Sequence, residues 1–253
     1  MLRNLNIPCL ALALLLPVFA RAAEVSDASK YANCMDLAAR DAEEAFEVAT
    51  AWQNLGGDEP ARHCAAVALF NIGHFEEAAK RFEMLAIQSE LTPALRAQAM
   101  AQAGQAWLQA GEPEKADGAL SDAIVVLPRD PSIWIDRSVV RASVGDYDRA
   151  ILDLAQALRI DPDRVEALTL RSAAYRLTGR TDAALDDINA ALARDPGNPE
   201  ALLERGILRE GNGDKDGARR DWIQVLTITP ESPTGQAARN HIERMDVSGK
   251  PPG

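Results

Sequence analysis

The chain has 253 residues, of which 47% are hydrophobic and only 5% aromatic, and its formal net charge is −11. A chain of this size can bury a sizeable core, and the shortage of aromatic residues favours a core built from Ala and Leu in closely packed short helices. The acidic balance disfavours nucleic acids and anionic membrane surfaces as partners, because both bind through clustered positive charge. The negative charge either keeps the protein soluble or selects basic partners.

Residues 1–22 have the features of a secretory signal peptide. An apolar run from Cys9 to Ala20 is followed by a small-x-small cleavage site, Ala20-Arg21-Ala22. The run is too short to span a bilayer. An uncleaved anchor or an ordinary core helix is the alternative. We expect a mature chain that begins at Ala23, is not inserted in a membrane and resides in the periplasm.

The next segment, 23–58, carries a helical pattern and one of the two cysteines outside the signal. Apolar residues recur at steps of three and four from Tyr31 to Leu55, and a Gly-Gly pair then breaks the helix. Removal of the signal removes Cys9 and leaves Cys34 and Cys64 in an oxidising compartment. We expect these two to form a disulfide between successive helices, with two buried free thiols as the alternative.

One pattern repeats from residue 59 to residue 232. Four units keep a spacing of 34 residues without insertion, and a fifth unit with a longer connection precedes them. The units are 59–92, 97–130, 131–164, 165–198 and 199–232. When the four regular units are aligned, three equivalent positions, or columns, keep one residue type: Gly111, Gly145, Gly179 and Gly213; Ala116, Ala150, Ala184 and Ala218; and Pro128, Pro162, Pro196 and Pro230. A helix–turn–helix unit of this length cannot bury its apolar face alone, so the units should stack on one another.

These columns resemble the tetratricopeptide repeat, which places small residues early, then an Ala, a bulky apolar residue and a closing Pro. The eighth position of the four regular units is small, as in that family: Gly104, Ser138, Ser172 and Gly206. The resemblance implies an all-α, right-handed solenoid of helix–turn–helix units with capping helices. It also implies a non-catalytic protein-binding module that holds a peptide or helix of a partner in a concave groove.

The two ends of the repeat array need caps, because a solenoid must cover its exposed apolar ends. Segment 23–58 is the expected N-terminal cap. At the other end, Ser232 and Pro233 are typical of the start of a helix, which we expect to run to about Met245. Residues 233–253 are thus a C-terminal capping helix followed by a tail, and we expect the tail to be disordered from Val247.

Two charged columns occur together in the repeats. Arginine stands at the seventh position and aspartate at the twenty-third in three units, and the unit that begins at Ala97 has alanine at both: the pairs are Arg137 with Asp153, Arg171 with Asp187 and Arg205 with Asp221. We expect structural ion pairs, within a unit or between neighbours, in which the Arg stem packs and its head is neutralised. An arginine ladder that binds anions is the alternative.

The resemblance also implies which residues line the groove, since the first helix of each repeat forms it in this family. The corresponding residues are Ile135, Val139, Thr169, Ala173, Arg176, Leu203, Ile207 and Glu210. We expect this surface to bind a partner by burying apolar side chains. The alternative is that neighbouring helices cover these residues and make them core.

No motif for catalysis, a cofactor or a metal ion stands out. The three histidines have no second ligand four residues away, and phosphate-binding glycine loops and nucleophile motifs are missing. We therefore expect a non-enzymatic scaffold or adaptor without a cofactor. The alternative is a cell-envelope enzyme or the regulatory subunit of one. The sequence identifies neither the partner nor the oligomeric state.

Overall fold

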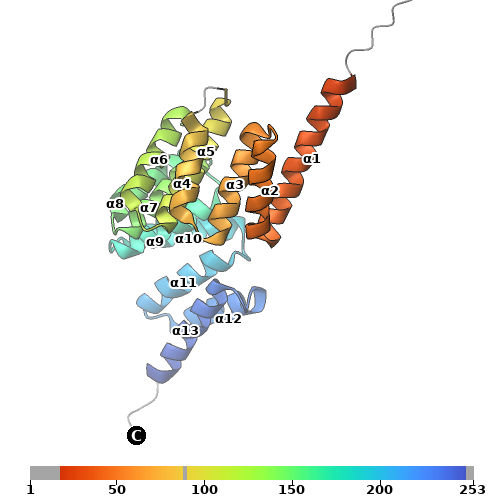
Figure 1. The fold of residues 1–253 in the computed structure, drawn as a ribbon. Coiled ribbons are helices and arrows are strands. Elements are labelled where there is room, and N and C mark those ends of the chain that lie inside the picture. The colour runs from red at the N-terminus through yellow and green to blue at the C-terminus, as the bar shows by residue number, and fades with distance from the viewer. Residues whose placement is uncertain (1–17, 88–89, 249–253) are drawn as a thin grey trace, which may run out of the picture. The chain divides into compact units, whose positions relative to one another are not determined.

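A computed structural model describes residues 18–87 and 90–248, and all of its regular structure is helical (Figure 1). The predicted signal peptide lies largely outside the described residues, and so does the end of the predicted tail. The helices are α1 (Val18–Arg40), α2 (Ala42–Asn54), α3 (Asp58–Ile72), α4 (Phe75–Ile87), α5 (Pro93–Gln109), α6 (Pro113–Val126), α7 (Pro131–Ser143), α8 (Tyr147–Ile160), α9 (Val165–Leu177), α10 (Thr181–Arg194), α11 (Pro199–Gly211), α12 (Lys215–Ile228) and α13 (Pro233–Ser248).

The chain forms two compact units, residues 1–74 and 75–253. In the first unit, α1 packs against both α2 and α3. The sequence pattern predicts one continuous helix from Tyr31 to Leu55, but the structure divides it at Asp41. The Asp41 side chain accepts a hydrogen bond from the backbone N–H of Glu44 at 3.1 Å, so this residue caps α2 instead of continuing α1.

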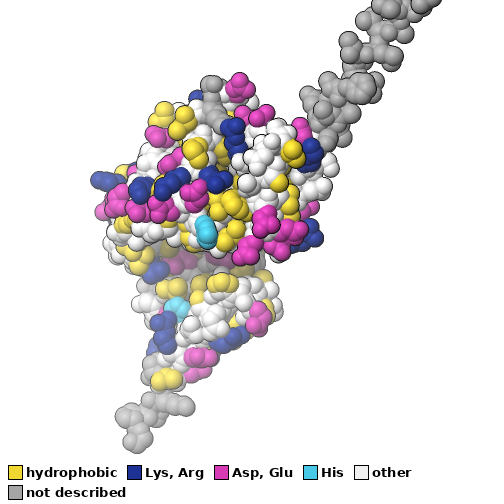
Figure 2. Space-filling view, in the orientation of Figure 1, with side chains coloured by type: hydrophobic (Ala, Val, Ile, Leu, Met, Phe, Trp, Pro, Cys, Tyr) yellow, Lys and Arg dark blue, Asp and Glu magenta, His cyan; other side chains and the backbone are white. Residues whose placement is uncertain are grey.

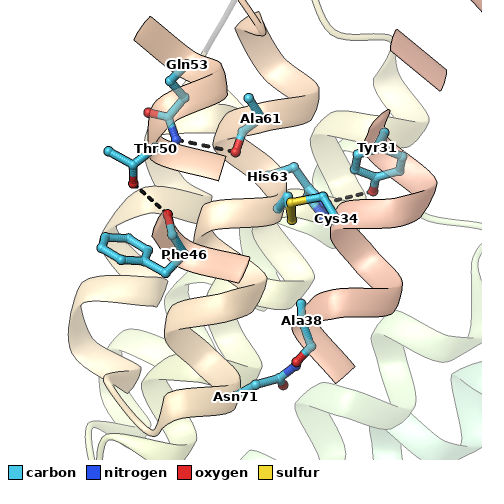
Figure 3. Close-up of a disulfide and its surroundings, with 10 residues drawn as sticks. Tyr31, Cys34, Ala38, Phe46, Thr50, Gln53, Ala61, His63 and Asn71 are labelled. Atoms are coloured by element: carbon cyan, nitrogen blue, oxygen red, sulfur yellow. Dashed lines mark hydrogen bonds between the residues drawn. A yellow bond between two sulfur atoms is a disulfide. The ribbon is translucent and has the colours of Figure 1, made fainter. Parts of the chain in front are cut away.

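A disulfide links α1 to α3 in this first unit (Figure 3). It joins Cys34 to Cys64, the pair that the sequence predicts, with their Cα atoms 6.2 Å apart. Next to it, the Tyr31 hydroxyl and the Nδ1 atom of His63 share a hydrogen bond of 2.9 Å. Farther along α1, the side-chain amide of Asn71 donates to the carbonyl of Ala38 at 2.8 Å. The two helices are therefore held together by a covalent bond and by hydrogen bonds on both sides of it.

The second unit consists of helices that pair in chain order. Within each regular repeat the first helix packs against the second: α5 with α6, α7 with α8, α9 with α10 and α11 with α12. The turn between the two helices needs a left-handed residue, and Gly145 and Gly179 supply it with φ angles of 79° and 75°. The repeated glycine column of the sequence is thus the column of these turns.

The small eighth position of each repeat admits a large side chain from the second helix. A Cβ atom at Gly104 would lie 2.6 Å from the Leu120 side chain, and one at Gly206 would lie 2.2 Å from the Trp222 ring. Both Leu120 and Trp222 are completely buried. These two glycines therefore make room for large, fully buried side chains of the core.

The last helix, α13, begins where the sequence predicts. The Ser232 hydroxyl accepts a hydrogen bond from the backbone N–H of Gly235 at 3.0 Å, so Ser232 caps the helix ahead of Pro233. The helix continues to Ser248, beyond Met245, so Val247 is helical and not part of a disordered tail. None of the described helices combines the length and the apolar character needed to cross a membrane.

Candidate functional site

Most first helices of successive repeats lie against one another in the second unit. Contacts join α5 to α7, α9 to α11 and α11 to α13 (Figure 1). Pro233 follows Pro199 by the same spacing that separates Pro199 from Val165. The helix α13 therefore occupies the place of a first helix in a further repeat. The face shared by these first helices is the candidate functional site, and we call it the groove face.

Two of the predicted groove residues are core residues instead. Ile135 on α7 is only 2% exposed and belongs to the hydrophobic core of the second unit, and Thr169 on α9 is also buried. The Thr169 hydroxyl donates to the carbonyl of Val165 at 2.9 Å, so its polar atom is satisfied within its own helix. The fifth position of these two repeats packs between helices and offers no open surface to a partner.

Val139 is the predicted groove residue that remains accessible. It is 40% exposed, although it lies one turn from the buried Ile135 on the same helix. On α9, Ala173 occupies the equivalent position and is half-buried. An exposed large apolar side chain of this kind can be buried by an apolar group of a partner.

Leu203 and Ile207 on α11 are half-buried and pack against the core cluster of this unit. The same cluster includes Ala238 and Met245 of α13, which lies against α11. At this end of the repeats, the two predicted groove residues pack against a core cluster to which α13 also contributes.

Glu210, the last predicted groove residue, also faces α13. Its Oε2 atom lies 3.5 Å from Nδ1 of His241, and the His241 ring stacks on Trp222 with centroids 4.6 Å apart. Burial lowers the pKa of His241, and the neighbouring Arg244 lowers it further. A shallow hollow runs along this side of α13, lined by Ala237, Asn240, His241, Glu243, Arg244 and Val247.

Arg176 is occupied by an acid of the next repeat. Its Nε and Nη2 atoms donate to the two carboxylate oxygens of Glu204 at 2.7 and 3.1 Å. Burial raises the pKa of Glu204, and the ion pair with Arg176 opposes that rise. This pair ties α9 to α11, so Arg176 is a structural residue in the unbound protein.

The three predicted Arg–Asp pairs all form within single repeats. Each arginine holds both oxygens of its aspartate through Nε and Nη2, at 3.0 and 2.7 Å for Arg137 with Asp153, 2.7 and 2.7 Å for Arg171 with Asp187, and 2.9 and 2.7 Å for Arg205 with Asp221. All three aspartates are buried. This bidentate geometry leaves little of each arginine for an external anion.

A second arginine joins two of these pairs, which the repeat pattern alone did not predict. Arg141 lies 2.8 Å from Asp153, and Arg209 lies 2.7 Å from Asp221. Both stand at the eleventh position of their repeats, where the repeat 165–198 has Tyr175, whose ring faces Arg171. The signal in the sequence was an arginine at the eleventh position in two of the three repeats that carry an Arg–Asp pair.

Asp136 is a further feature that sequence reasoning missed. It is half-buried on α7, and Nε2 of Gln105 on α5 donates to its Oδ2 atom at 3.1 Å. Burial raises the pKa of Asp136 to about 6, an effect that the hydrogen bond from Gln105 only partly offsets. The groove face thus contains a carboxylate that is partly withdrawn from water and paired with a neutral amide.

The outer surface has a different character. On the face shown in Figure 2, basic and acidic side chains lie beside one another over α4 to α8. On α4, Lys80 pairs with Glu76 at 2.7 Å and Arg81 pairs with Glu77 at 3.0 Å, one helical turn apart. In the described part of the chain, no group of three or more His, Cys, Asp or Glu side chains is arranged to hold a metal ion.

The comparison with known families agrees with this helical arrangement. Residues 135–199 and 178–233 match the sequence profile of the tetratricopeptide repeat family. Residues 135–233 therefore carry the sequence signature of tetratricopeptide repeats. The matched stretch covers α8 to α12 and most of α7, and it therefore includes the three Arg–Asp pairs and Val139. No curated protein sequence matches the chain.

Solved structures of tetratricopeptide repeat proteins share the fold. TTC0263 from Thermus thermophilus is 19% identical, with a TM-score of 0.59 over 74% of this chain and 97% of its own. YrrB, described as having an unusual peptide-binding site, is 18% identical, with a TM-score of 0.52 over 79% of this chain and 99% of its own. The APC/C hetero-tetramer Cut9-Hcn1 is 16% identical, with a TM-score of 0.64 over 88% of this chain and 45% of its own. The expected all-α repeat solenoid is confirmed.

Proposed function

We propose that the chain is a non-catalytic adaptor of the bacterial periplasm that holds a segment of a partner protein on the groove face of its tetratricopeptide repeats. Val139 carries the proposal, because it is a large apolar side chain left exposed on α7, a first helix of the groove face. Burying such a side chain fully contributes about 1.5–3 kcal/mol to binding. The peptide-binding site of YrrB supports a role of this kind for the shared fold.

Two observations support the periplasmic location. The sequence has an apolar run and a small-x-small site at its start, and Cys34 and Cys64 are joined in a disulfide. Disulfides persist in oxidising compartments and are rare in the cytosol. Fractionation of cells followed by intact-mass measurement should find a periplasmic protein that begins at Ala23. A cytoplasmic protein that retains residues 1–22 would contradict this part of the proposal.

Photo-crosslinking in intact cells tests the adaptor role. A photo-reactive residue at Val139 should capture one or a few defined proteins, identified by mass spectrometry. The matched control is the same residue at Leu152, which is 68% exposed on α8, a second helix outside the groove face. Capture of the same proteins with equal yield from Leu152, or no capture from Val139, would contradict binding on the groove face.

The identity of the captured protein also decides the alternative role, the regulatory subunit of a cell-envelope enzyme. If the captured protein is an enzyme, its activity should be compared with and without the purified chain. A change in turnover indicates regulation, whereas unchanged turnover with altered location or assembly indicates an adaptor.

A further inference from the structure

A comparison of equivalent positions in the repeats shows how the charge of a buried acid on the groove face is neutralised. Glu204 is the sixth residue of its repeat, and Arg176 is the twelfth residue of the preceding repeat. The two hydrogen bonds between them neutralise the carboxylate of Glu204. One repeat earlier, the sixth residue is Leu170 and the corresponding twelfth residue is Ala142, so both are apolar. In these two cases the twelfth residue matches the chemistry of the sixth.

Asp136 breaks this match. It is the sixth residue of its repeat, and the twelfth residue of the preceding repeat is Leu108, which is half-buried and carries no charge. The Asp136 carboxylate receives its hydrogen bond from the neutral amide of Gln105 instead. Within the described residues, no basic side chain lies at ion-pair distance from Asp136.

The other buried carboxylates of these repeats do have a cation. Asp153, Asp187, Asp221 and Glu204 each accept at least two hydrogen bonds from arginine, as described above. Withdrawing an ionised carboxylate from water is unfavourable unless a charge partner compensates. Asp136 therefore has an electrostatic cost in the unbound protein that its counterparts avoid.

The surroundings of Asp136 favour a cation from outside. Glu166 and Asp130 act on it with like charge, and Arg164 acts with opposite charge. Arg164 already has partners, since its Nη2 atom donates to the Ser132 hydroxyl at 3.2 Å and to Glu166 at 3.4 Å. The local charge is thus negative, and the accessible Val139 lies less than one helical turn away on α7.

We propose that Asp136 anchors a lysine or arginine side chain of the partner segment, which takes the place that Arg176 fills beside Glu204. The adjoining apolar part of that segment packs on Val139 and Leu108. This inference rests on the proposed function, because it names the chemistry of the partner that the groove face accepts. It is supported by charge complementarity and by the mismatch between Asp136 and Leu108.

Binding of a small cation probes the anchor directly. The probe is n-butylguanidinium, an arginine side-chain analogue with an apolar tail, and the control ligand is n-butylurea, which has a similar shape and no charge. NMR spectra of the protein are recorded at pH 7.5 during titration with each compound. We expect saturable shifts at Gln105, Asp136 and Val139 with the cation, and at least a fivefold weaker response with the urea.

Two variants and a matched control complete the test. Asp136→Asn removes the anchor, and Leu108→Arg supplies the missing cation from within the chain, so both should abolish the saturable shifts. Asp186→Asn, on the exposed side of α10, makes the same change in net charge away from the groove face and should leave the shifts unchanged. Equal shifts with n-butylurea, or shifts that persist in Asp136→Asn, would overturn the proposal. Since Asp136→Asn is nearly isosteric, the proposal stays testable even if Leu108→Arg fails to fold.

Crosslinking separates this inference from the proposed function. Asp136→Asn should reduce capture from Val139 at least tenfold, and Asp186→Asn should not. If capture persists at full yield in Asp136→Asn, the adaptor role stands and the cation anchor is wrong. If Val139 captures nothing in the unmodified background, the proposed function itself fails.

Discussion

At the scale of single residues, the buried ion pairs allow the contribution of one side chain to the free energy of unfolding to be measured. Arg171 and Asp187 are 20% and 10% exposed, and the hydrogen bond with Asp187 raises the pKa of Arg171. Asp187→Ala should therefore cost about 1–3 kcal/mol, because it leaves a shielded guanidinium without its partner. Urea denaturation measures this cost.

A double-mutant cycle then isolates the pair. Removing both Arg171 and Asp187 should cost less than the sum of the two single changes, because neither charge is then left unpaired. Additive costs would mean that these two side chains are not energetic partners, despite their bidentate contact.

The glycines of the repeats offer a second test at this scale. Gly206→Ala should destabilise the protein by about 1–3 kcal/mol, because its new Cβ would overlap the Trp222 ring in a packed core. Gly118→Ala is the control: it lies inside α6, is exposed and has open space around its Cβ position. That change should stabilise the protein by about 0.5–1 kcal/mol through helix propensity. Thermal and urea unfolding of the two variants should move in opposite directions.

The raised pKa of Asp136 makes the free energy of unfolding of the unbound protein depend on pH in a predictable direction. Its pKa of about 6 lies above its usual value of 3.8, so the folded protein holds this proton more tightly than the unfolded chain does. The free energy of unfolding should therefore fall as the pH rises from about 4 to about 6. Asp136→Asn should remove this component, while Asp186→Asn should retain it. Parallel pH profiles for the unmodified protein and Asp136→Asn would contradict the assignment.

At the scale of helices, the disulfide is the main constraint on the first unit. Cys34 and Cys64 are separated by 30 residues, and closing a loop of this size contributes roughly 3–4 kcal/mol in the chain-entropy model. Alkylation of the unfolded protein without reductant should add no mass, and two adducts should appear after reduction. Two adducts without reductant would show free thiols.

The break between α1 and α2 shows a limit of predicting helices from apolar periodicity alone. The apolar spacing from Tyr31 to Leu55 continues in phase across Asp41, so the periodicity alone indicates one helix. The capping hydrogen bond from Glu44 to Asp41 decides the break. A side chain that can cap is visible in the sequence, but whether it does so depends on the packing of α1 against both α2 and α3.

The groove residues show a second limit at this scale. Position within the repeat indicated that Arg171 and its counterparts form ion pairs, within a unit or between neighbours, and in the structure both partners belong to one repeat. Exposure depends on the neighbouring repeat, which the pattern does not define. Ile135 is therefore core and Val139 accessible, although both are aliphatic residues on one helix.

At the scale of the whole molecule, the fold was predictable and the binding surface only partly so. The spacing of glycine, alanine and proline columns determines where helices turn and which faces pack, and the family resemblance supplied the stacking of the units. Asp136 was not predicted as a site residue, because no motif marks it. It stands out only because the residue at the twelfth position of the preceding repeat, Leu108, carries no charge. A binding surface built between repeats becomes visible only when neighbouring helices are placed together.

The position of α13 has a consequence for the accessible area of the groove face. This helix is a first helix for which the described chain provides no second helix, and in a repeat array a terminal element is stabilised from one side only. We expect its amide hydrogens to exchange faster than those of α9, by local opening instead of global unfolding. Native-state hydrogen exchange measures both, and equal protection would contradict this view. Each opening removes Ala238 and Met245 from the core cluster against which Leu203 and Ile207 pack. If the proposed adaptor role holds, the free energy of that opening would set how much of the groove face a partner segment can reach.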